Sequence, residues 1–212
     1  ETDSNDSVLF DLFERKGFDE IMSFMNHLPT KGNNYITHEL VKKVLNSTYN
    51  LQDIELTVDE DTKLFDVKIN KLFEIAGFNE IDRIYSSIPS NLKNENINLK
   101  RIEAYFLRNE YRNACDLLNN EKFEKSYLFG KFEIICNIIN QKFEKARFNL
   151  ALLKEINEPG NNLFIDLCYS IMGDVKILKP EEMSERLEKI SVLNPILLSS
   201  LQCRLMFSCI ST

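Results

Sequence analysis

Apolar residues recur at spacings of three and four along most of the chain, between short polar segments. This spacing gathers apolar side chains on one helix face and predicts α-helices rather than strands. Residues 126–140, SYLFGKFEIICNIIN, are apolar around most of the circumference, as in a helix covered on several sides. Residues 143–157, FEKARFNLALLKEIN, carry Ala146, Leu150 and Leu153 on one face. The two stretches are predicted to form the first and second helix of one hairpin.

A short motif repeats along the chain. An aromatic or apolar residue is followed three positions later by a small or aliphatic one. It occurs at Phe18–Ile21, Phe78–Ile81, Tyr111–Ala114, Phe143–Ala146 and, in degenerate form, Val175–Leu178. From residue 78 the intervals are 33, 32 and 32 residues, and a period of this length is the signature of stacked repeats. Turn and cap residue types precede each aromatic. The aromatic is therefore predicted to begin the second helix of a hairpin, and the residue three positions later to face the first helix.

We therefore predict an all-α fold, a right-handed α-solenoid of about six stacked helical hairpins that spans residues 1–212 as one array. Thr57 or Asp59 is expected to cap the helix that leads to Phe73, and Ser90–Asn98 to form a polar loop. The predicted hairpins are about 8–29, 35–56, 62–89, 99–120, 126–157 and 163–190.

The C-terminal stretch NPILLSSLQCRLMFSCIST, residues 194–212, is still apolar where the last helix of a solenoid is expected to be polar outside. Three explanations stay open. The 212 residues are the N-terminal part of a longer polypeptide, a partner or a second copy covers this helix, or the helix folds back on the stack.

The net charge of −7 and the scattered Lys and Arg residues argue against nucleic-acid binding, which needs clustered basic residues. No apolar run approaches the roughly 20 residues of a membrane-spanning helix. The polar start ETDSNDS suits either an exported chain or a trimmed one, so the compartment stays open between cytoplasm and periplasm or cell envelope.

The chain has five cysteines, and none are spaced as CxxC. Four of them lie beside apolar residues, so buried free thiols are expected, with one disulfide left open for an exported protein. The two histidines, His27 and His38, are expected at the surface, and the acidic cluster Asp59–Asp61 at a helix start. Neither glycine-rich phosphate loops nor nucleophile motifs occur, so we expect no enzyme, no cofactor and no metal site.

The segments NEYRNA, QKFEKA and GDVKIL resemble the turn of the tetratricopeptide repeat. The resemblance implies stacked helical hairpins that bind a protein or peptide. Arg101 and Glu133 lie where that family has apolar residues, so its peptide-binding residues are not transferred to this chain. Residues 100–207 also resemble uncharacterised helical-repeat proteins of alphaproteobacteria, which supply no known activity.

Stacked hairpins create a concave surface lined by the first helices, and polar side chains there suit peptide carboxylates or backbone amides. We therefore expect a non-catalytic protein–protein interaction scaffold. The alternative is the superhelical, non-catalytic arm of a larger cell-envelope enzyme. The candidate binding residues, for which plain solvation is the competing explanation, are Lys100, Arg101, Arg108, Lys131, Glu133, Asn137 and Asn140.

Overall fold

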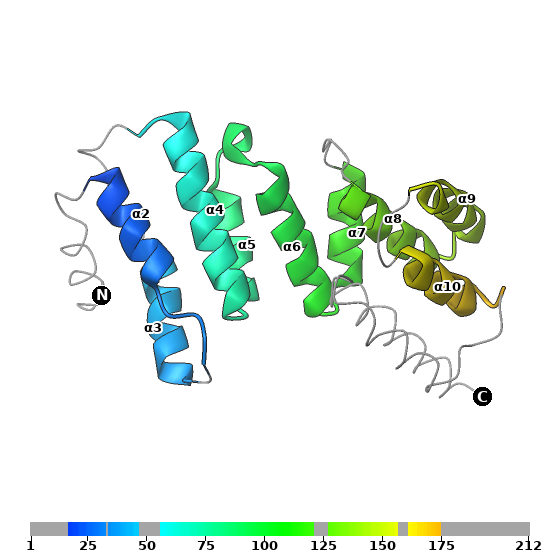
Figure 1. Ribbon diagram of the computed structural model, residues 1–212, viewed down its shortest axis with the longest axis horizontal. Coiled ribbons are helices and arrows are strands. Elements are labelled where there is room, and N and C mark those ends of the chain that lie inside the picture. Colours follow the sequence, from blue (N-terminus) through cyan, green and yellow to red (C-terminus); the bar gives the residue numbers. More distant parts are fainter. Residues whose placement is uncertain (1–16, 33, 47–55, 121–126, 157–160, 175–212) are drawn as a thin grey trace. The chain divides into compact units, whose positions relative to one another are not determined.

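The computed structural model describes residues 17–32, 34–46, 56–120, 127–156 and 161–174 (Figure 1). The described residues form α-helices and one short 3-10 helix, η1, with no strand among them, which confirms the all-α prediction. The elements are α2 (Phe18–His27), α3 (Tyr35–Asn46), α4 (Val58–Glu74), α5 (Phe78–Ser87), η1 (Ser90–Leu92), α6 (Glu95–Leu107), α7 (Tyr111–Asn120), α8 (Tyr127–Ile139), α9 (Phe143–Lys154) and α10 (Asn161–Met172).

The chain divides into two compact units, Glu1–Ala104 and Tyr105–Thr212, with the boundary inside α6. In the first unit, α4 packs against α2, α3 and α5, which lie beside it in Figure 1. Its core is mostly aliphatic, with Ile69, Leu72 and Ile81 fully buried, and it also contains the buried side chains of Met25 and Tyr85. In the second unit, α8 packs against α7, α9 and α10, so three neighbours cover the helix whose circumference is mostly apolar.

Each of the four described copies of the repeated motif marks the start of a helix, and the fifth copy, Val175–Leu178, lies outside the described residues. The helices α2, α5, α7 and α9 begin at Phe18, Phe78, Tyr111 and Phe143. The residue three positions after each aromatic is almost completely buried, as predicted. These residues are Ile21, Ile81, Ala114 and Ala146.

The turn before the aromatic has one backbone geometry, which the sequence did not reveal. At the end of α4, Gly77 N–H donates to the Leu72 carbonyl and Ala76 N–H to the Phe73 carbonyl, a Schellman motif. The same paired bonds close α6, α8 and α10. The left-handed residue is Ala76, Asn109 or Gln141 in three turns and Gly173 in the fourth. The glycine of the repeated segment, Gly77, is therefore not the left-handed residue. A Cβ at Gly77 would lie 3.0 Å from Leu72 Cδ2, so close packing favours glycine at this position.

One predicted helix cap is confirmed, and one predicted loop is wrong. Thr57 caps α4 through a reciprocal capping box with Glu60, so the helix begins at Val58 and includes the acidic cluster. The segment predicted as a polar loop, Ser90–Asn98, instead contains η1 and the first turn of α6, where Asn94 accepts a hydrogen bond from Ile97 N–H. Asn, a poor helix former in the interior, is a good cap, which explains why an Asn-rich stretch was misread.

In α5, α7 and α9, the fourth residue after the aromatic contacts a segment that follows the helix. Asp82 of α5 accepts a hydrogen bond from Arg101 Nε of α6 at 2.8 Å. At the same repeat position, Cys115 of α7 forms a disulfide with Cys136 of α8. Arg147 of α9 forms two hydrogen bonds with Asp174, just after α10. The same repeat position therefore connects α5, α7 and α9 to a later segment, through an Arg–Asp ion pair in two cases and through a disulfide in the third.

Several predicted segments lie outside the described residues. These are the first helix of hairpin 8–29, the second helices of hairpins 35–56 and 163–190, and the apolar C-terminal stretch.

Candidate functional site

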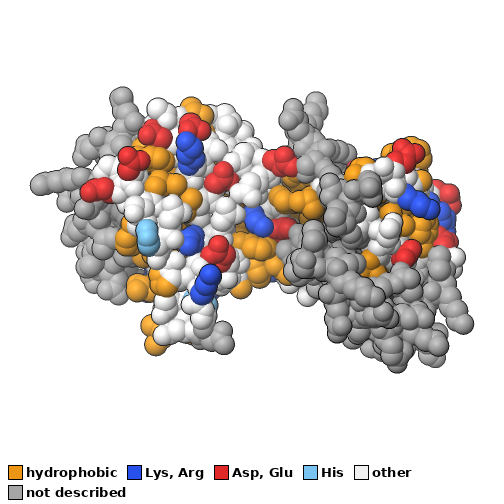
Figure 2. Space-filling view, viewed as in Figure 1, with side chains coloured by type: hydrophobic (Ala, Val, Ile, Leu, Met, Phe, Trp, Pro, Cys, Tyr) orange, Lys and Arg blue, Asp and Glu red, His pale blue; other side chains and the backbone are white. Residues whose placement is uncertain are grey.

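Helices α8 and α9 form a hairpin whose inner surface is buried and whose outer surface is partly apolar. The inner residues of α9, Ala146, Leu150 and Leu153, are at most 5% exposed. On the outer surface, Phe148 is 64% exposed, Leu152 49% and Ile156, just after the helix, 44%. These three residues are spaced by four and form one ridge along α9. Figure 2 shows hydrophobic side chains beside charged ones over this part of the molecule.

A groove of about 210 Å³ lies between α8 and α9 beside this ridge. Gly130 and Ile134 of α8 line one side, and Leu152 and Ile156 line the other. Ile134 is buried, whereas Leu152 and Ile156 are about half exposed, so the groove has an apolar floor and an accessible apolar edge. The remaining lining residues are Glu133, Asn149 and Leu153.

The polar residues of the groove leave it nearly neutral. Lys145 Nζ of α9 donates to Glu133 Oε1 of α8 at 2.9 Å, which balances the carboxylate that lines the groove. Asn149 contributes an uncharged amide that can both donate and accept hydrogen bonds. The site therefore suits an uncharged apolar group beside a peptide backbone, and it offers no general acid–base pair.

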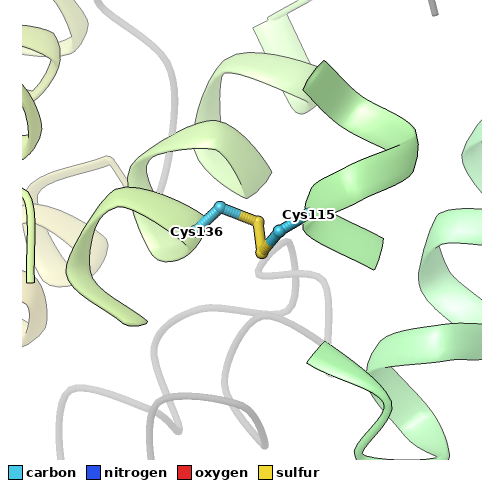
Figure 3. Close-up of a disulfide and its surroundings, with 2 residues drawn as sticks. All are labelled: Cys115 and Cys136. Carbon is cyan, nitrogen blue, oxygen red and sulfur yellow. A yellow bond between two sulfur atoms is a disulfide. The ribbon is translucent and has the colours of Figure 1, made fainter. Parts of the chain in front are cut away.

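The disulfide Cys115–Cys136 holds α8 against α7 (Figure 3). Both cysteines are buried, and their Cα atoms are 5.5 Å apart. The expectation of free thiols was wrong for this pair, because packing brings together residues that lie 21 positions apart in the sequence. It is confirmed for Cys168, a buried free thiol whose pKa is raised by burial. Cys203 and Cys209 lie outside the described residues.

Two of the predicted binding residues, Lys100 and Arg101, lie on α6 in the first unit. Lys100 Nζ donates to the buried Glu103 at 2.7 Å and lies 4.3 Å from the centre of the Phe73 ring. Arg101 pairs with Asp82, and its guanidinium lies 4.0 Å from the centre of the Tyr85 ring. Both cations are thus engaged in contacts within the chain.

The other predicted binding residues belong to the second unit. Arg108 pairs with Glu110 at 3.0 Å, and Glu133 lines the groove. Lys131 and Asn137 are buried, and Lys131 Nζ lies 5.6 Å from the centre of the Phe164 ring. Asn140 is exposed at the end of α8. Of this set, the groove includes Glu133 alone.

Among the groove residues that were not predicted, one could have been noticed in the sequence. Gly130 interrupts the apolar run YLFGKFEIICNII inside a predicted helix, where glycine is unfavourable. Leu152 and Ile156 gave no such signal, because a single exposed aliphatic residue is ordinary on a protein surface.

Other classes of site receive no support from the described part of the chain. Its His, Cys, Asp and Glu residues form no group of three that could hold a metal ion. None of its helices is long and apolar enough to cross a membrane. On the face shown in Figure 2, basic side chains lie singly among acidic ones.

Comparison with known proteins identified no relative. No protein-family model, curated protein or solved structure matches the chain.

Proposed function

We propose that this chain is a non-catalytic protein-interaction module, a right-handed α-solenoid of tetratricopeptide-like hairpins that binds an apolar segment of a partner protein. The observation that carries the proposal is the groove between α8 and α9, where half-exposed Leu152 and Ile156 border a buried floor. Apolar side chains grouped around a concave surface are typical of peptide-binding sites.

The size of the groove favours a side chain of a protein partner over a small molecule. Pockets for small molecules and cofactors usually enclose roughly 300 to 1,000 Å³. The groove, at about 210 Å³, is smaller and suits one large apolar side chain that anchors a longer contact.

The proposal places the partner in this groove rather than on the polar residues of the first helices. Lys100, Arg101 and Arg108 are engaged in ion pairs within the chain, and Lys131 and Asn137 are buried. A partner that used these side chains would have to break existing contacts before forming its own.

The test is selection of peptide ligands on the full chain. Phage-displayed random 16-residue peptides are selected, synthesised with a fluorophore and titrated by fluorescence polarisation. Leu152→Asp and Ile156→Asp place a carboxylate at the apolar edge of the groove, so each is expected to weaken binding tenfold or more, about 1.4 kcal/mol. The matched control is Ala151→Asp, an exposed α9 position that does not line the groove. Absence of any selected peptide, or equal affinities for all three variants, would refute the proposal.

One observation favours a second candidate, the non-catalytic arm of a larger cell-envelope enzyme. Disulfides persist in oxidising compartments and are rare in the cytosol of mesophiles, and the pair Cys115–Cys136 is bonded. The open reading frame around these residues distinguishes the candidates. A signal peptide upstream with a catalytic domain downstream supports the enzyme arm, whereas further helical repeats support the scaffold.

A further inference from the structure

Gly130 is a glycine that the described part of the fold does not require. It lies inside α8 with helical backbone, away from the positive-φ region. A Cβ added at Gly130 would meet no heavy atom of the described residues within 4 Å, whereas one at Gly77 would lie 3.0 Å from Leu72 Cδ2. Glycine destabilises a helix relative to alanine. Gly130 therefore lowers the stability of α8, although the packing of α8 does not require a glycine at this position.

The space that Gly130 leaves open belongs to the groove. Gly130 lines it together with Ile134, opposite the apolar edge formed by Leu152 and Ile156. A side chain at this position would fill part of about 210 Å³. The missing Cβ therefore deepens the groove beside Gly130, and a partner's side chain could approach the backbone of α8 there.

The shape and charge of the surroundings indicate what the partner presents. Phe148, Leu152 and Ile156 form an exposed ridge with a spacing of four, and such ridges pack against the grooves of another helix. The carboxylate of Glu133 is paired with Lys145, so the groove is nearly neutral although the chain carries a net charge of −7. The complementary surface is an amphipathic helix with an uncharged apolar face rather than a basic one.

We propose that Gly130 is the specificity-determining residue of this groove, which accepts an amphipathic partner helix through one bulky apolar anchor, Leu or Phe, seated over Gly130. The inference rests on the proposed function. It adds the size of the anchor and the residue that selects it.

The experiment uses a peptide selected on the full chain and its variants with Phe, Leu, Val or Ala at the anchor. Gly130→Ala is expected to raise the melting temperature and yet to weaken the Phe- and Leu-anchored peptides tenfold or more. The Val- or Ala-anchored peptide should lose less than threefold. The matched control is Asn119→Ala, an exposed position of α7, which increases helix propensity without changing affinity.

The outcomes separate this inference from the proposed function. If Leu152→Asp abolishes binding and Gly130→Ala leaves every affinity unchanged, the groove binds peptides but Gly130 does not select the anchor, and the inference is wrong. A lower melting temperature for Gly130→Ala would also overturn it, because the Cβ would then have met resistance. If neither substitution affects binding, the proposed function itself fails.

Discussion

Removal of the disulfide Cys115–Cys136 is expected to destabilise the second unit by about 3 kcal/mol. The bond closes a loop of 21 residues between α7 and α8, and the entropy removed from an unfolded chain by such a loop corresponds to that value. The perturbation is the double substitution Cys115→Ala and Cys136→Ala, measured by urea unfolding followed by circular dichroism. Reductant should have a similar effect on the natural sequence, and a clearly smaller effect on the double variant.

Thiol counting tests the premise of this prediction directly. The chain has five cysteines, so alkylation of the unfolded protein without reductant should leave at least two unmodified in the mass spectrum. Asp82→Ala is the matched comparison, because Asp82 occupies the same repeat position and forms a partly exposed ion pair with Arg101. That variant should cost about 1 kcal/mol or less. Alkylation of all five thiols, or equal costs for the two perturbations, would refute the reasoning.

Three further predictions concern the core and the turns. Ala146→Leu should destabilise by about 1–3 kcal/mol in urea unfolding, since Ala146 is completely buried, whereas Ala151→Leu on the exposed side of α9 should change stability by less than about 0.5 kcal/mol. Burial lowers the pKa of Lys68 from its usual 10.5 to about 7, so the unfolded chain binds more protons between these values and stability should rise with pH across that window. Lys68→Met should remove this rise, whereas Lys43→Met, at an exposed position, should leave the rise in place. An unchanged pH profile for Lys68→Met would contradict the prediction. Gln141→Gly should stabilise by about 0.5–1 kcal/mol, because Gln141 has a φ of 58° and glycine adopts this conformation without steric cost; a lower melting temperature would contradict it.

The sequence predicted the repeat because the repeat is local. An aromatic and the residue three positions later share a helix face wherever the segment is helical, so Phe143 and Ala146 could be assigned without knowledge of the fold. The cap at Thr57 was predictable for the same reason, since its partner Glu60 lies three residues away. The four turns share one backbone geometry, but their left-handed residues include Ala76 and Gln141. Neither residue type favours this conformation, so the turn geometry could not be predicted from the sequence.

The candidate site could be predicted from the sequence only in fragments. Polar residues of the first helices were expected to bind a partner protein. However, the ion pair of Arg101 and the burial of Lys131 depend on neighbouring helices. The glycine in α8 was visible in the sequence, but whether a Cβ would collide or face open space depends on what packs beside it.

The sequence was enough to predict helices, their starts at the repeated aromatics and the buried residue three positions later, because these features arise within one turn of the chain. The packing between helices determined that the next residue is an ion-pair carboxylate at Asp82 and a disulfide cysteine at Cys115. It also decided that Gly130, Leu152 and Ile156 border one groove. Those outcomes depend on contacts between helices, and the hydrophobic pattern that builds each helix does not specify which side chains meet across them.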